Sequence, residues 1–250
     1  MDERQNDSRT SLESFFSRET KCGPEEIECF IKLLSENWSQ LNDVCKTERL
    51  MMLTKLLAKY GHMLPSIEHS FKIFNIAAIL MEILKQSPEI EDSKEERSSF
   101  VRLQRTALHI CAAASEISAV ISKELANNYA IHFLTLLMGK DGSYWELEEK
   151  EFLEVQRNCV EALINVCRRE SDVQAFREIR VKWIFQKYLD TKDNITRIAV
   201  ASTLIKVYAP ECSYREGSSI AFTRSRCQER INGTFGKRIL NTLLFMSEIF

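Results

Sequence analysis

Histidine and cysteine are the residues of this chain whose chemistry could hold a metal ion. The sequence has 4 His and 8 Cys, but it contains no C-x-x-C, H-x-x-x-H or HExxH spacing. Zinc sites in proteins are built from such close ligand pairs. His109 and Cys111 come nearest to a pair, yet two residue steps along a helix turn them about 200° apart. The sequence therefore predicts no metal centre and no other cofactor.

The cysteines are interpreted as free thiols, most of them buried. Several fall on apolar faces of predicted helices, and the chain begins with charged and polar residues where a secretory signal would be apolar. A cysteine nucleophile would also need a histidine placed beside it by the fold, and no motif indicates one. We therefore expect no enzymatic activity. The eight positions are Cys22, Cys29, Cys45, Cys111, Cys159, Cys167, Cys212 and Cys227.

Basic residues near the C-terminus are the other candidate for binding chemistry. The run from Gly233 to Arg238 superficially resembles a phosphate loop, but it lacks the spacing, the hydroxyl after lysine and the preceding strand. A basic patch there could hold an acidic peptide or a phosphate at a helix start, and a simple solvated helical face is the alternative. The patch comprises Arg224, Arg226, Arg230, Lys237 and Arg238.

Composition limits the elements that could position these residues. The chain has 250 residues, of which 44% are hydrophobic and 28% charged, with only 7 Gly and 4 Pro. That is too little turn chemistry for a sandwich or barrel, so an all-α fold is expected. The net charge of −2 argues against nucleic acid as a partner. No apolar run approaches the roughly 18 residues of a spanning helix, so we expect no membrane insertion and a cytoplasmic or nuclear protein.

Apolar residues at helical spacing predict a series of helices. Their predicted ranges are 24–41, 50–60, 65–84, 100–114, 117–121 and 131–138. Gly61 is expected to close the second helix in the left-handed conformation. The acidic segment 143–154 is expected to be either an exposed insertion or an acidic first helical turn.

Residues 21–250 are expected to form a single helical-repeat domain after a flexible N-terminal segment, 1–20. Loops are predicted near 87–98, 139–150 and 209–224.

The stretch from Val155 to Ala209 resembles a known family. The third helix of an armadillo repeat reads roughly R-x-x-A-x-x-A-L-x-N-L and recurs after about 40 residues. One matching set is Arg157, Val160, Ala162, Leu163, Asn165 and Val166; the next is Arg197, Ala201, Leu204 and Val207. Gln104-Arg105 resembles an earlier copy, 52 residues before Gln156-Arg157. The resemblance implies a right-handed superhelix of stacked helices, an α-solenoid.

The resemblance also implies a function. Armadillo proteins that bind extended peptides clamp the peptide backbone with a ladder of asparagines, and Asn165 matches one rung. Ala113 and Ile205 stand at the corresponding positions of the neighbouring copies. A non-enzymatic adaptor or scaffold for a protein partner is therefore expected, with Asn165, Arg157 and Arg197 as further candidate contacts. The alternative is a client-binding chaperone similar to the myosin-directed chaperones.

The last residues form a strongly apolar predicted helix. Its apolar residues are Leu240, Leu243, Leu244, Phe245, Ile249 and Phe250. They could pack back on the solenoid, continue into a longer array, or mediate self-association.

Overall fold

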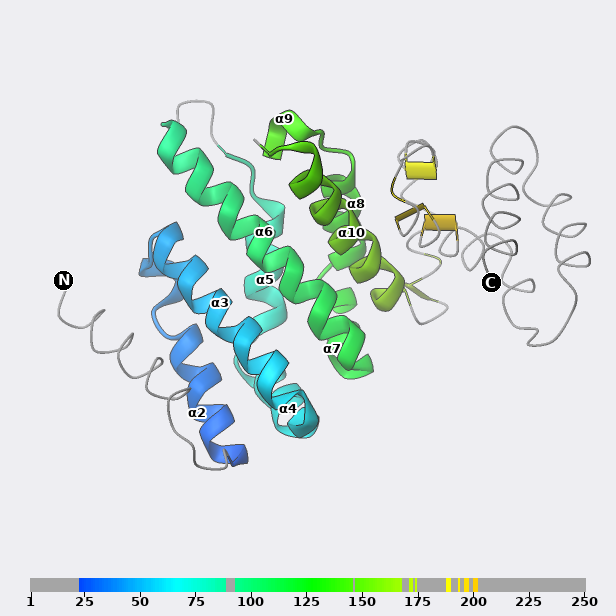
Figure 1. Cartoon of the computed structure of the whole chain (residues 1–250). Coiled ribbons are helices and arrows are strands. Elements are labelled where there is room, and N and C mark those ends of the chain that lie inside the picture. The colour runs from blue at the N-terminus through cyan, green and yellow to red at the C-terminus, as the bar shows by residue number, and fades with distance from the viewer. Residues whose placement is uncertain are drawn as a thin grey trace, which may run out of the picture. The chain divides into compact units, whose positions relative to one another are not determined.

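The computed structural model describes residues 23–88, 93–145, 147–167, 171–172, 174, 188–189, 193, 196–197 and 200–201. Within these ranges the regular structure is helical throughout, which agrees with the predicted all-α class (Figure 1). The predicted N-terminal segment 1–20, the loop at 209–224 and the C-terminal apolar helix lie outside the described residues. Contacts divide the chain into two compact units, Met1–Tyr129 and Ala130–Phe250.

The first unit begins with helix α2, Pro24–Ser35, which buries Ile27, Phe30, Ile31 and Leu34 as the spacing predicts. Pro24 stands at a tolerated first-turn position, and Glu26 accepts a hydrogen bond from the Gly23 backbone N–H at 2.8 Å. The predicted helix to residue 41 is too long. Asn37 takes the left-handed conformation, with φ of 54°, and ends the α-helix before Trp38.

Helix α3, Asp43–Tyr60, follows the short 3-10 helix η1, Trp38–Gln40. The Asn42 side chain caps α3 by accepting the Cys45 N–H at 2.9 Å. At the other end Gly61 is right-handed, with φ −55° and ψ −21°. The predicted left-handed closure is therefore wrong, because the chain continues directly into a second 3-10 helix, η2, Gly61–Met63.

The predicted helix 65–84 is two helices, α4, Leu64–Ile73, and α5, Ile76–Lys85. Asn75 separates them in the left-handed conformation, with φ of 51°, which asparagine tolerates better than most residues. The break changes the register of the apolar stripe. Ala78, predicted to be buried, is exposed, whereas Ala77 and Leu80 are buried.

Helix α6, Lys94–Ile117, begins well before the predicted start near Phe100. The Ser93 hydroxyl accepts the Glu96 N–H and the Glu96 carboxylate accepts the Ser93 N–H, which is a capping box. Lys94 to Ser99 are therefore helical, although the sequence predicted a solvated loop there. Helix α7, Ala119–Asn127, then completes the first unit.

Helix packing in the first unit places α3 alongside α6, α2 against α4, and α5 and α7 against α6 (Figure 1). Leu56 of α3, Ile67 of α4 and Leu80 of α5 are fully buried. On α6, Leu103, Ala107, Leu108 and Cys111 are buried as predicted. The core thus lies between the layer of α3 and α6 and the shorter helices behind it.

The second unit contains α8, Ala130–Met138, α9, Gly142–Trp145, and α10, Glu149–Val166. Helix α10 packs against α8 and α9. Glu149 and Glu151 lie in the first turn of α10, so the acidic segment forms an acidic first turn, which was one of the two predicted alternatives. Trp145 within the same segment is buried, contrary to the other alternative, an exposed insertion.

Two long helices, α3 and α6, each place a buried polar side chain at the C-terminal carbonyls of an earlier, shorter helix. Arg49 of α3 donates to Leu33, Leu34 and Glu36 at the end of α2, at 3.0, 3.0 and 2.6 Å.

Gln104 of α6 occupies the same kind of position at the end of α5. Its side-chain amide donates to the carbonyl oxygens of Ile83 and Gln86, at 3.2 and 2.8 Å. In the second unit, Gln156 of α10 hydrogen-bonds Tyr188, whose hydroxyl donates to Met138 at the end of α8, at 2.6 Å. Carbonyls that the helix ends leave without partners are thereby satisfied.

Candidate protein-binding surface

Helix α3 exposes apolar side chains on the face opposite its core stripe. Val44 is 54% exposed and Met51 is 43% exposed. They are seven residues apart on one helix and therefore lie on the same side of it. Exposed apolar side chains of this kind are available for contact with a partner.

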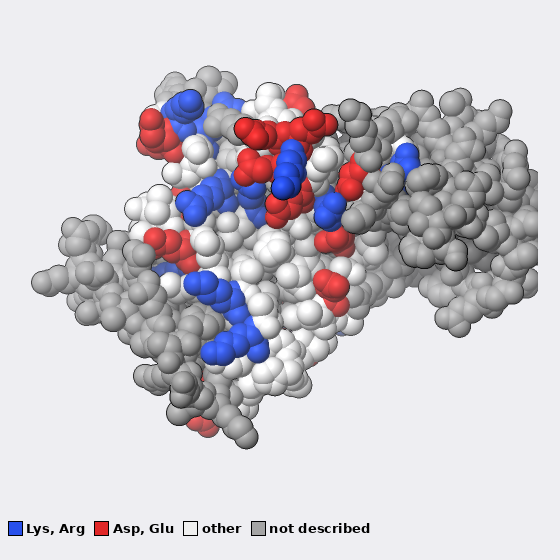
Figure 2. Space-filling model, viewed as in Figure 1, with Lys and Arg blue, Asp and Glu red and all other residues white. Residues whose placement is uncertain are grey.

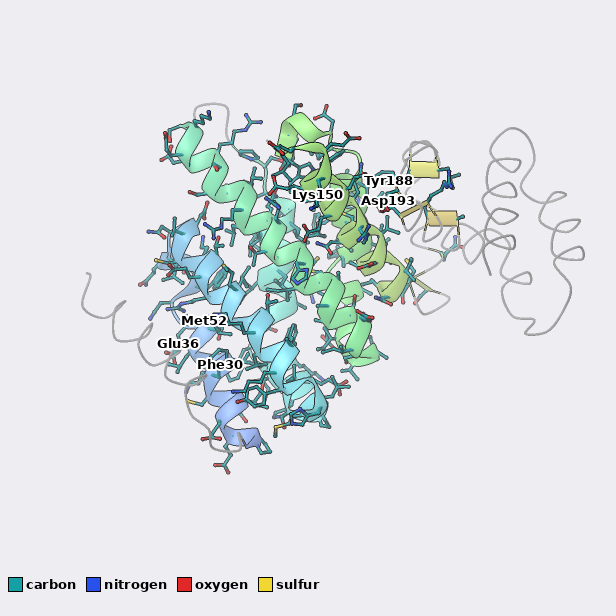
Figure 3. The ribbon with its side chains drawn as sticks, in the orientation of Figure 1. Phe30, Glu36, Met52, Lys150, Tyr188 and Asp193 are labelled. Atoms are coloured by element: carbon teal, nitrogen blue, oxygen red, sulfur yellow. The ribbon has the colours of Figure 1, made fainter. Side chains whose placement is uncertain are left out.

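Lysines continue the same face of α3. Lys55 and Lys59 are exposed and follow Met51 by one and two helical turns. The Lys59 ammonium lies 5.2 Å from the centre of the Tyr60 ring, which holds its stem along the helix. Figure 3 labels Phe30 on α2 and Met52 on α3; both belong to the buried side of this helix pair.

Helix α6 contributes the adjoining strip of surface. Arg102 and His109 are exposed and lie seven residues apart, on the face of α6 opposite its buried residues. Figure 2 shows Lys and Arg side chains over both helices on one side of the molecule, with uncharged surface between them. We define the α3–α6 ridge as Val44, Met51, Lys55, Lys59, Arg102 and His109.

The cations of the ridge are not neutralised by neighbouring carboxylates. Across the part of the chain that is described, Lys55, Lys59 and Arg102 make no ion pair. The carboxylates of the same faces are Glu48, which is half-buried and already engaged, and Glu95 and Glu116, which are exposed in the first and last turns of α6. Lys55, Lys59 and Arg102 therefore make the middle of the ridge, between those turns, locally basic.

In the second unit, the structure gives the predicted contact residue Arg157 an internal partner. Its Nη2 lies 3.3 Å from both carboxylate oxygens of Asp193. Asp193 in turn accepts the Thr196 N–H at 3.1 Å and so caps the helical residues that follow. Figure 3 shows Asp193 together with Tyr188.

The environment of Asp193 sets its charge. Burial alone would raise the pKa of this carboxyl, but hydrogen bonds from Thr196 and the Arg157 guanidinium together hold the pKa below its usual value. The carboxylate is therefore charged at neutral pH. Arg157 thus joins α10 to Asp193 and so to the helical residues 196–197 that follow it.

Asn165 and Arg197 are the other predicted contacts within the described residues. Both are half-buried and already take part in interactions within the chain. Their role in binding stays a prediction. The basic patch of Arg224, Arg226, Arg230, Lys237 and Arg238 lies outside the described residues.

The thiols follow the expected pattern where they are described. Cys111, Cys159 and Cys167 are buried core side chains, Cys45 is half-buried and Cys29 is exposed. Burial raises the pKa of the Cys111 thiol well above its ordinary value, so this thiol is unreactive. Cys22, Cys212 and Cys227 lie outside the described residues.

Sequence reasoning did not find the ridge. The predicted helix began at Leu50 and only its buried stripe was followed. A projection of the whole of α3 would have placed Val44, Met51 and Lys55 together on the opposite side.

The class that the described residues define is an all-helical protein. Comparison with models of known families, with curated proteins and with solved structures finds no match to this chain. None of the described helices is long and apolar enough to span a membrane.

Proposed function

We propose that this chain is a non-enzymatic adaptor built from armadillo-like helical repeats, and that it binds a segment of a protein partner on the α3–α6 ridge. The observation that carries the proposal is the exposure of Val44 and Met51 beside cations that form no ion pair among the described residues, on the outer face of a helix whose opposite face is core. The exposed part of each side chain is available to a partner.

The order of helices supports the repeat. Two short helices followed by a long one occur twice in succession: α4, α5 and α6 have 10, 10 and 24 residues, and α7, α8 and α10 have 9, 9 and 18. The second series includes the single-turn helix α9 before α10. This is the element order expected of armadillo-like units, and in each series the long helix packs against the second of the two short ones, α6 against α5 and α10 against α8.

The buried polar side chains near the helix ends also support the proposed helical repeat. Arg49, Gln104 and Gln156 stand 55 and 52 residues apart along the sequence. Each is buried on a long helix: Arg49 and Gln104 donate to carbonyls at the ends of α2 and α5, and Gln156 hydrogen-bonds Tyr188, which donates to the end of α8. An arrangement repeated at nearly constant spacing indicates one structural unit used more than once.

The energy available to a partner follows from the exposed areas. Covering the exposed part of Met51 would remove about 90 Å² of apolar surface from water, which is worth about 2 kcal/mol at about 25 cal/mol per Å². Replacing Met51 by aspartate removes this contribution and leaves a charge to be desolvated. We expect affinity for a partner segment to fall at least about tenfold.

The test is a selection from a displayed library of random 16-residue peptides against the purified full chain. Enriched peptides should bind saturably to the wild-type chain and lose binding to Met51→Asp. The matched control is Ile73→Asp on α4, where the side chain is similarly exposed at 49% but lies off the ridge. Far-UV circular dichroism of all three proteins shows whether each variant stays folded.

Two outcomes would overturn the adaptor proposal. One is the absence of any saturable binder, and the other is a set of binders that Met51→Asp and Ile73→Asp weaken equally. Suppression of aggregation of an unfolded client at equimolar protein would instead indicate the chaperone alternative.

A further inference from the structure

Resting on the proposed function, we infer that the segment bound by the α3–α6 ridge is acidic and carries an apolar side chain that covers Met51. The inference comes from the juxtaposition on α3 and α6 of exposed apolar side chains with cations that form no ion pair among the described residues. This inference specifies the charge and the apolar character of the bound segment. Neither the helix order nor the exposed apolar area defines them alone.

The positions of the cations determine the charge pattern that would fit. Lys55 and Lys59 lie one and two turns beyond Met51 on α3, and Arg102 lies on the adjacent helix α6. A segment that places an apolar side chain on Met51 therefore has cations beside it on both helices. Carboxylates on that segment would meet positive charge wherever it extends along the ridge.

Existing carboxylates do not already supply this complement. Asp43 at the start of α3 is paired with Lys46 at 3.6 Å, and Glu48 is half-buried and engaged. Glu95 and Glu116 are exposed on the same face of α6 as Arg102, but they lie in the first and last turns of that helix. A basic segment would face repulsion at the centre of the ridge, whereas an acidic one would be attracted there.

Met51 can make an apolar contact with partner surfaces of different shapes. Its side chain is unbranched and polarizable and adapts to different partner surfaces. Val44, two turns earlier on the same face, supplies a second, stiffer apolar contact. The ridge therefore combines an apolar strip that provides affinity with flanking cations that select for charge.

The experiment uses two synthetic peptides and the full-length chain. One peptide is the sequence most enriched in the library selection; the other is the same sequence with every Asp and Glu replaced by Asn and Gln. Binding is measured by isothermal titration calorimetry at 50 and 500 mM NaCl. We expect the acidic peptide to bind at least about tenfold more tightly at low salt, and the advantage to shrink at high salt because the ridge charges are exposed.

Two triple variants show whether the preference for the acidic peptide depends on the ridge cations or on the overall charge of the protein. Lys55→Gln/Lys59→Gln/Arg102→Gln removes three ridge cations, and Lys32→Gln/Lys72→Gln/Lys123→Gln removes three exposed cations from α2, α4 and α7. Both variants change the net charge equally, so a nonspecific field effect would weaken binding in both. We expect only the ridge variant to lose affinity for the acidic peptide, by about tenfold, since each exposed pair contributes a few-fold.

The outcomes separate this inference from the proposed function. Equal binding of the acidic and amide peptides, with binding still abolished by Met51→Asp, would overturn the acidic preference and leave the adaptor proposal standing. An equal loss in both triple variants would also overturn it. If the selection yields no peptide that binds, the adaptor proposal fails and this inference fails with it.

Discussion

Replacing Arg49 by methionine tests whether one buried guanidinium holds the end of α2. Three carbonyl oxygens, those of Leu33, Leu34 and Glu36, accept from the same nitrogen, Nη1. That nitrogen has two hydrogens, so the three contacts amount to two full hydrogen bonds. At about 1.5 kcal/mol each for a charged donor, their loss costs about 3 kcal/mol.

Methionine keeps part of the aliphatic packing of the Arg49 stem, which limits the loss to that of the hydrogen bonds. Burial lowers the pKa of Arg49, but guanidinium groups titrate so far above neutrality that Arg49 is charged at pH 7. We therefore expect a net destabilisation of about 2 to 3 kcal/mol at neutral pH.

Urea unfolding measures this loss, followed by circular dichroism and by tryptophan fluorescence, to which Trp38 contributes from just beyond the end of α2. The control is Lys46→Met on the same helix, which also removes one positive charge. Lys46 forms only a partly exposed pair with Asp43, so we expect a change below about 0.5 kcal/mol. Equal unfolding midpoints for the two variants would refute the capping role of Arg49.

Three further changes test neighbouring parts of the argument. Gln104→Leu should lower the free energy of unfolding by about 1 to 2 kcal/mol, measured in urea, because two buried carbonyls at the end of α5 lose their donor. Ser93→Ala should cost about 1 kcal/mol by thermal melting through loss of the α6 cap, whereas Ser98→Ala, at an exposed position inside the same helix, should be neutral or slightly stabilising. Asp193→Asn should destabilise the chain at pH 7. Because the pKa of Asp193 is lowered in the folded state, the wild-type advantage exists above the unfolded pKa of about 3.9 and disappears as the pH falls through the lower folded value, so the urea midpoints of the two proteins should converge as the pH falls below about 3.9.

Helix positions were predictable where apolar spacing is regular and uninterrupted. The stripe of α3 and the stripe through Leu103, Ala107 and Leu108 of α6 are buried as their spacing indicates. The spacing of apolar residues does not by itself reveal a single residue in the left-handed conformation. Asn37 and Asn75 each end a helix inside a run that still looks periodic, because asparagine adopts that conformation at little cost and the apolar residues beyond it resume at a new register.

Caps explain the other differences between prediction and structure. The segment before Phe100 is so rich in charge that it resembles a loop, yet Ser93 and Glu96 form the reciprocal pair that starts a helix. The same S-x-x-E spacing is visible in the sequence and could have been used. Gly61 is the converse case, because a glycine at the end of an apolar stripe permits a left-handed turn but does not require one.

The candidate surface was harder to predict than the core for a physical reason. A buried stripe must be apolar along its whole length, so it produces a periodic signal. An exposed binding face only needs a few side chains, and Val44 and Met51 are separated by polar residues that would be ordinary on any solvated helix. Their meaning depends on the exposed face of α6, which carries Arg102 and His109, lying beside that of α3, and only the packing of the two helices provides this.

The caps on the helix ends bear directly on the proposed repeat. Arg49, Gln104 and the pair Gln156 and Tyr188 satisfy carbonyls of shorter helices with three different chemical groups. Under the proposed repeat, a donor would be required at each of these places while its residue type could vary, so hydrogen bonds would recur where residue identity does not. The caps are therefore a sharper test of the proposed repeat than residue identity, since the loss of each donor should free the end of the helix that it serves.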